Sequence, residues 1–110
     1  MRVIRWLDSA ELDLTNIIRY IEVTFGTSTA SQVFDDIMLR VEALCQFPYL
    51  GTFYPLVQYK GLKVYTLHER HTRVFYSITD SEIIIVLVWN NLKDDSAIVE
   101  LLSFASQNPL

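Results

Sequence analysis

The sequence of 110 residues predicts an α+β fold: an N-terminal strand and an antiparallel helical hairpin packed on a twisted antiparallel β-sheet, with a C-terminal helix. Three observations predict it. Apolar residues recur at helical spacing in two stretches with only residues 26–28 between them, then form three strand-like runs, and finally return to helical spacing. We expect residues 1–110 to form a single domain, because no linker or repeat interrupts a chain of one domain's length.

The N-terminal part carries the opening strand and the first helix. Residues 2–7 are β-branched and aromatic with partial alternation, which favours a short strand. Asp8 or Ser9 is expected to cap the following helix, with Glu11 in a capping-box-like relation to Asp8. Apolar residues then recur at helical spacing until Gly26, which is well placed to end the helix.

The second helix has the clearest pattern in the chain. Thr27 or Ser28 can cap it, and apolar residues recur at three- and four-residue intervals until Phe47-Pro48 ends the pattern. Because the connection between the helices is so short, they should lie side by side as an antiparallel hairpin. We expect their apolar stripes to cover a sheet.

The sheet is predicted from the second half of the chain. Residues 48–55 are rich in turn-forming and aromatic types, which indicates a loop. The runs Leu62–Leu67, His71–Thr79 and Glu82–Trp89 are strand-like, with short polar breaks that suggest two tight hairpins and an antiparallel meander. The last run is apolar on both faces, so it should be central and covered on each side.

A last helix should begin at Asp94, Asp95 or Ser96, and the final residues should be frayed.

The only cysteine, Cys45, falls on an apolar helical stripe and is interpreted as a small buried hydrophobe in a reducing compartment. The N-terminus has no signal-peptide pattern, and the longest apolar run has seven residues where a membrane span needs about 20. We therefore expect a cytoplasmic protein without a membrane segment.

The charge is unevenly distributed. The net charge of −4 argues against an extended DNA-binding surface, because Lys and Arg contacts to phosphate dominate nucleic-acid affinity. Residues 58–79 nevertheless form a local cationic segment that contains Lys60, Lys63, Arg70 and Arg73. Two interpretations stay open for these four side chains: a solvated sheet edge and hairpin, or a surface that binds carboxylates of a target or partner protein.

Both histidines lie in the same segment, but His68 and His71 have no third ligand at suitable spacing, so no metal and no cofactor are expected. If either histidine titrates functionally, it would act as a general base. The large aromatic residues Trp6, Phe75, Tyr76 and Trp89 are expected in the core.

Several segments together resemble one protein family. They are Trp6 followed by Ala10-x-x-Asp13-Leu14-x-x-Ile17-x-x-Tyr20-Ile21, then Ile37–Leu44 leading into Phe47-Pro48-x-x-Gly51, and finally Arg73–Ile78 followed by Ile83–Trp89. From about residue 5 to 95 the chain is similar to the ParE/RelE superfamily, the toxins of bacterial type II toxin-antitoxin (plasmid stabilization) systems. The resemblance implies one of two activities: ParE-like members inhibit DNA gyrase by binding, and RelE-like members cleave messenger RNA in the ribosome.

Cleavage of RNA through its own 2′-hydroxyl needs a base, an acid and cations for the developing phosphorane charge. RelE-like members supply these groups from the central strands and, usually, from a tyrosine or histidine near the C-terminus. The candidates here are Lys63, His71, Arg73 and Lys93. The set is incomplete, because no tyrosine or histidine follows Tyr76 and Thr52 stands where an arginine commonly follows the corner glycine.

We therefore expect a ParE-like toxin that inhibits an essential target, DNA gyrase by resemblance, and we favour a binding protein over an enzyme. The alternatives are a RelE-like ribosome-dependent mRNA endoribonuclease, whose partners would be the ribosome and mRNA, and a non-toxic interaction module with the same fold. All three expect a partner, and a cognate antitoxin usually binds such a domain through an extended or helical apolar segment. The candidate exposed hydrophobic side chains for such contacts are Phe53, Tyr54 and Tyr59.

Overall fold

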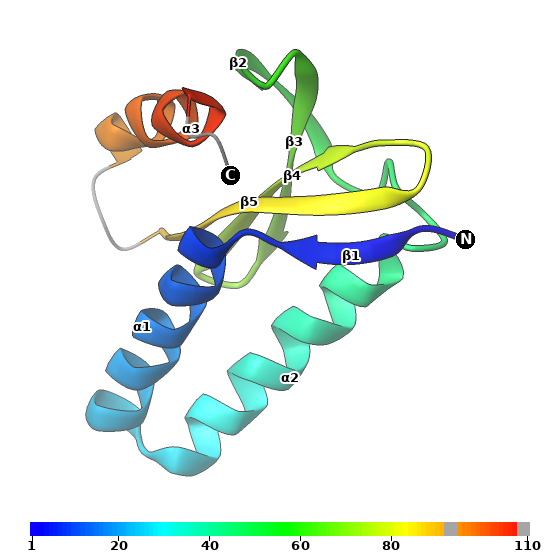
Figure 1. Cartoon of the computed structure of the whole chain (residues 1–110). Helices are drawn as coiled ribbons and strands as arrows, with labels where there is room; N and C mark the ends of the chain where they lie inside the picture. The colour runs from blue at the N-terminus through cyan, green and yellow to red at the C-terminus, as the bar shows by residue number, and fades with distance from the viewer. Residues whose placement is uncertain (92–94, 108–110) are drawn as a thin grey trace.

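The computed structural model describes residues 1–91 and 95–107 and confirms the α+β class (Figure 1). In chain order the elements are β1 (Val3–Trp6), α1 (Asp8–Phe25), α2 (Thr27–Ala43), β2 (Thr52–Tyr59), β3 (Leu62–Glu69), β4 (Thr72–Ile78), β5 (Glu82–Asn90), a short 3-10 turn (Asp95–Ala97) and α3 (Ile98–Gln107). The helical hairpin α1–α2 covers one face of the sheet and α3 covers the other.

The sheet has the strand order β1-β5-β4-β3-β2. Strands β3 to β5 form the predicted antiparallel meander and β2 extends it, but β1 is parallel to β5, with Ile4 opposite Ile83 and Trp6 opposite Ile85. The expectation of an antiparallel sheet therefore needs correction at β1, and the sheet is mixed. Parallel strands need a long crossover between them, and here the helical hairpin and β2–β4 supply it.

Strand β2 was not expected. The loop predicted for residues 48–55 is wrong beyond Gly51, because Thr52–Tyr59 pairs with β3 at the edge of the sheet. Pro55 lies inside a register shift between Tyr54 and Gln58, where pairing with β3 lapses. An edge strand tolerates proline at such an irregularity because no ladder hydrogen bond is lost there.

The two helices follow their predicted patterns with one difference at each start. Leu7, not Asp8 or Ser9, is the N-cap of α1, and no side-chain cap bond forms. Leu7 stays extended because its N–H donates to Ile85 O of β5 (3.1 Å), so the chain turns directly from the sheet into the helix. Gly26, not Thr27 or Ser28, is the N-cap of α2, again without a side-chain cap bond. The same residue ends α1 with φ of 98°, a conformation that favours glycine.

Two apolar cores lie on the two faces of the sheet. The hairpin-side core joins α1 and α2 to one face and includes Leu14, Ile37, Val41, Tyr76 and Ile85. The α3-side core includes Tyr59, Val64, Phe75, Trp89 and Leu102. Residues 83–89 of β5 are buried throughout, which confirms that this strand is central and covered on both sides.

The core assignments agree with the structure for Phe75, Tyr76 and Trp89, while Trp6 is partly buried against the hairpin-side core. The last helix is confirmed, but Asp95 and Ser96 lie in the 3-10 turn that precedes its start at Ile98, and Asp94 lies outside the described residues. Within residues 1–91 and 95–107, no helix combines the length and the apolar character that a membrane crossing requires.

Candidate functional site

A groove runs along α1, between this helix and the edge of β5. It consists of three adjoining cavities of about 450, 490 and 410 Å³. The first and second cavities share Asp13 and Leu101, and the second and third share Tyr20 and Asn90. Because of these shared walls, the groove continues from the start of α1 to the connection between α1 and α2.

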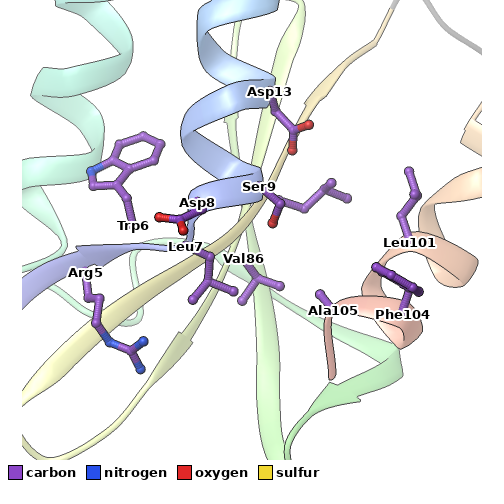
Figure 2. A pocket seen from close by; sticks show the side chains of 11 residues that line it. Arg5, Trp6, Leu7, Asp8, Ser9, Asp13, Val86, Leu101, Phe104 and Ala105 are labelled. Atoms are coloured by element: carbon purple, nitrogen blue, oxygen red, sulfur yellow. The ribbon is translucent and has the colours of Figure 1, made fainter. Parts of the chain in front are cut away.

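The first cavity lies where β1 passes into α1, opposite α3 (Figure 2). Leu7 and Val86 contribute apolar surface from the sheet side, and Leu101 and Phe104 contribute it from α3. Phe104 is 66% exposed. Helix α3 therefore turns apolar side chains both to the sheet and to this open cavity, which is unusual for a surface helix.

Asp13 forms part of the groove wall and accepts a hydrogen bond from β5 beyond the point where β1 stops pairing with it. The pairing of β1 with β5 ends at Trp6 and Ile85, after which only the Leu7 N–H reaches Ile85 O. Further along β5, the Val88 N–H donates to Oδ2 of Asp13 on α1 (3.2 Å). A buried strand edge needs such an acceptor, so this carboxylate fixes α1 against β5 and lines the first two cavities.

The far end of the groove has the opposite charge. There, Tyr20 and Phe25 of α1 face Arg70 and His71 from the turn between β3 and β4. Asp13 lies at the other end with Asp8, whereas the nearby Arg5 is already paired with Glu82 (3.0 Å). The groove is thus largely apolar, with carboxylates near the start of α1 and, at the end that carries Arg70 (the cationic end), a guanidinium that is itself paired with carboxylates.

Ion pairs hold the cationic end. Arg70 has φ of 53° in the turn, and its guanidinium lies 3.2 Å from Oδ2 of Asp36 on α2 and 3.9 Å from Glu69. Arg40 of α2 lies 3.5 Å from the other carboxylate oxygen of Glu69. The turn is therefore anchored on α2 by charges that remain in contact with solvent.

The corner between α2 and β2 is held differently, by a buried hydroxyl. The Tyr76 hydroxyl donates to Pro48 O (2.7 Å) and accepts from the Gly51 N–H (3.0 Å). Burial raises the pKa of Tyr76 above its ordinary value of 10.0, the phenols of Tyr65 and Tyr49 add to the rise, and the Gly51 N–H opposes it. The hydroxyl therefore stays neutral and serves as a structural pin.

Comparison with known proteins decides the family. Residues 4–94 match the model of the ParE toxin of the type II toxin-antitoxin system, parDE. The chain belongs to the ParE toxin family. A solved structure described as the chromosomal ParDE TA system from P. aeruginosa is similar at 24% identity and a TM-score of 0.64, covering 82% of this chain and 95% of that one. At this identity the likeness shows the fold, and no curated protein matches the sequence.

In this ParE-family chain the four predicted cations do not form one cluster. Lys60 and Lys63 lie at the β2–β3 end of the sheet, whereas Arg70 and Arg73 lie at the β3–β4 turn. Seven residues of extended chain separate Lys63 from Arg70, roughly 23 Å. The cationic segment of the sequence is therefore divided between the two ends of β3.

The nuclease candidates are also divided between the two faces of the sheet. Lys63 is two residues from Tyr65 on β3, which packs on the hairpin-side core, so it lies on that face. Arg73 is two residues from Phe75 on β4, which belongs to the α3-side core, and its guanidinium carbon lies 5.5 Å from the Phe75 ring. Nε of Arg73 donates to Oδ1 of Asn91 (2.8 Å).

His71 is exposed in the turn beside Arg70, and Lys93 lies outside the described residues. His68 is on β3 directly opposite Arg73, on the face that α3 covers. Among residues 1–91 and 95–107, no group of three or more His, Cys, Asp or Glu side chains is placed to hold a metal ion.

Sequence reasoning missed the groove. Asp13 was noticed only as part of the family pattern, although a carboxylate beside the buried stripe of α1 was a usable signal. The second signal was the apolar outer side of α3, formed by Leu101 and Phe104. The expectation of an exposed Tyr59 is wrong, because this side chain is 3% exposed and packs under α3, whereas Phe53 is half-exposed.

Proposed function

We propose that this chain is the toxin of a type II toxin-antitoxin pair, acts in the cytoplasm by binding and inhibiting DNA gyrase, and is neutralised by a cognate antitoxin. The observation that carries the proposal is the match of residues 4–94 to the ParE toxin family. The groove along α1 gives such a toxin a surface suited to a regulatory partner.

The positions of the candidate catalytic cations support inhibition by binding. A phosphoryl-transfer site needs its cations and its base around one phosphate, within hydrogen-bond reach. Lys63 and Arg73 lie on opposite faces of the sheet, and about five residues of strand, roughly 17 Å, separate their positions. These two side chains therefore do not serve one phosphate together.

The groove suits an antitoxin segment in shape and charge. Its three cavities form a long apolar channel with Tyr20, Phe25 and Phe104 partly exposed, which fits a helical or extended peptide that contributes apolar side chains. Asp13 at one end and Arg70 at the other favour a segment with a basic residue near the start of α1 and an acidic residue near its end.

A DNA-supercoiling assay with purified gyrase tests the toxin activity. We expect the full chain to inhibit supercoiling of relaxed plasmid and the addition of the antitoxin encoded beside it to restore activity. A chain that leaves supercoiling unchanged at large molar excess would exclude gyrase as the target.

Substitutions in the groove test the antitoxin site. Phe104→Glu places a charge in the apolar channel and should weaken antitoxin binding about tenfold or more. Val23→Glu on α1 is the control, because Val23 is also highly exposed but lines none of the three cavities. Equal losses for both variants would contradict the assignment of the groove.

One observation favours the ribonuclease alternative. His68 and Arg73 are cross-strand neighbours, which places a potential base beside a cation on the same face of the sheet. An in vitro translation assay that maps mRNA ends tests it. Cleavage by the wild type that disappears in folded Arg73→Ala would replace the gyrase proposal with ribosome-dependent cleavage.

A further inference from the structure

The corner between α2 and β2 exposes a second, separate apolar surface. We define the corner patch as Phe47, Tyr49, Leu50 and Phe53, whose exposed fractions lie between 44% and 67%. Tyr49 and Phe53 both pack on the ring of Tyr65, with centroids 5.6 and 5.9 Å away. None of the four lines the α1 groove.

The corner patch is large enough to be the centre of a protein interface. Four half-exposed side chains of this size present on the order of 400 Å². The largest apolar patch of a typical monomer is roughly 300–600 Å² and is often functional, and a standard interface buries about 800 Å² per partner. The patch therefore supplies the apolar centre, and surrounding residues would supply the polar rim.

The patch is also rigid before any partner arrives. The Tyr76 hydroxyl holds both Pro48 and Gly51, and the Tyr76 ring stacks on Tyr65 at 5.7 Å. Aromatic anchors fixed in advance lose little conformational entropy on binding and commonly carry much of the binding energy. A rigid set of anchors of this kind suits a folded protein surface, whereas the long channel along α1 suits a peptide.

The charges around the patch indicate the chemistry of the partner. The segment from residue 43 to 59 contains no charged residue in a chain of net charge −4. A cation lies beside the patch, because Nζ of Lys63 is 5.7 Å from the Phe53 ring centroid. Two copies of the patch facing each other would bring two lysines together, so self-pairing is disfavoured, and a carboxylate on the partner is favoured.

We propose that the corner patch, with Lys63 at its rim, docks the toxin's protein target through an apolar surface edged by carboxylates, while the α1 groove holds the antitoxin. This inference rests on the proposed function as a toxin. It assigns the two partners to two surfaces that share no residue, so the two binding activities are separable by mutation.

Matched substitutions test the separation. Leu50→Glu and Phe53→Ala change the patch, and Leu39→Glu and Phe34→Ala make the same changes at exposed positions of α2 outside it. Each variant is compared with wild type for gyrase affinity by biolayer interferometry, for growth arrest on expression, and for antitoxin affinity. Urea unfolding confirms that each variant is folded, and Phe53→Ala keeps the test valid if Leu50→Glu does not fold.

We expect the patch variants to bind gyrase about tenfold or more weakly, to lose growth arrest and to keep antitoxin affinity, while both α2 controls resemble wild type. Lys63→Glu should also weaken gyrase binding, and Lys63→Arg should retain it. Patch variants that arrest growth like wild type would overturn the inference, and so would patch variants that lose only the antitoxin.

Measurements on the wild-type chain show whether the proposed function itself fails. A wild-type chain that arrests growth without binding gyrase removes gyrase as the target. The role of the corner patch is then tested only by the comparison of growth arrest between the patch variants and the wild type. A wild-type chain that does neither removes the toxin activity and the inference with it.

Discussion

Strand β3 lies beside two places where the sheet is fixed to α2 and its extension, one beside its middle and one at its C-terminal end, and the interactions differ. At the corner, which lies beside Thr66, the buried Tyr76 hydroxyl bonds Pro48 and Gly51. At the turn end, Arg70 forms an ion pair with Asp36, with both side chains in contact with solvent. A buried neutral hydrogen bond is costly to break, whereas an exposed ion pair contributes little and is screened by salt.

This difference corresponds to the two proposed roles. The corner patch benefits from rigidity, because its aromatic anchors are then preorganised for a folded partner. The cationic end of the groove benefits from a weak attachment, because Arg70 can exchange Asp36 for a carboxylate of a bound segment at small cost. The contrast predicts a series of decreasing effects on stability.

The largest effect is expected for Gly51→Ala. A Cβ at this position would lie 2.7 Å from Thr66 O and 2.8 Å from the Tyr76 hydroxyl, and the first of these atoms belongs to the backbone and cannot swing away. We expect a loss of about 3 kcal/mol in the free energy of unfolding, measured by urea denaturation. Thr52→Ala, at the exposed neighbouring position, should change it by less than about 0.5 kcal/mol. Equal effects would mean that the corner is not tightly packed.

Tyr76→Phe should have the next largest effect. It keeps the ring but removes one donor and one acceptor, which leaves Pro48 O and the Gly51 N–H without this partner. We expect a loss of about 1–2 kcal/mol. Amide hydrogen exchange should accelerate at Gly51 more than in β5, and unchanged protection at Gly51 would contradict the role of the hydroxyl as a pin.

The same pair of proteins gives a pH test. Because burial raises the pKa of Tyr76 above 10.0, the unfolded chain loses this proton first as pH rises. The stabilisation by the neutral hydroxyl is therefore complete below pH 10.0 and declines above it. The gap in unfolding free energy between wild type and Tyr76→Phe should narrow above pH 10.0, and a gap that widens there would show that the ionised form is the stabilised one.

How far the sequence predicts this molecule depends on the range of the interactions. Helices α1 and α2 and strands β3 to β5 follow from periodicity, which is a local property. Strand β2 was missed because Pro55 and its aromatic neighbours are typical of a loop and are tolerated only at a sheet edge. The parallel pairing of β1 with β5 joins residues about 80 positions apart, and no local pattern encodes it.

The candidate site shows the same limit more strongly. The four cations between Lys60 and Arg73 are close in sequence, but β3 and β4 separate them in space. They lie at two ends and on two faces of the sheet. Tyr76 was correctly expected in the core, whereas the function of its hydroxyl depends on the position of Pro48, 28 residues away. Asp13 likewise gains its role only because the pairing of β1 along β5 stops at Ile85 and does not reach Val88.

The smallest effect is expected at the turn between β3 and β4. Asp36→Asn removes the ion pair with Arg70 and still offers an acceptor to the Gln32 side chain, so only the charge interaction changes. Because Arg70 and Asp36 are partly exposed, we expect a loss of only about 0.2–1 kcal/mol at low salt, which should disappear near 1 M NaCl. Asp35→Asn, the neighbouring change of charge, controls for the altered net charge. If Asp36→Asn cost as much as Tyr76→Phe, and the loss persisted in high salt, the corner and the turn would be equally rigid, and the turn could not release Arg70 to a bound antitoxin cheaply.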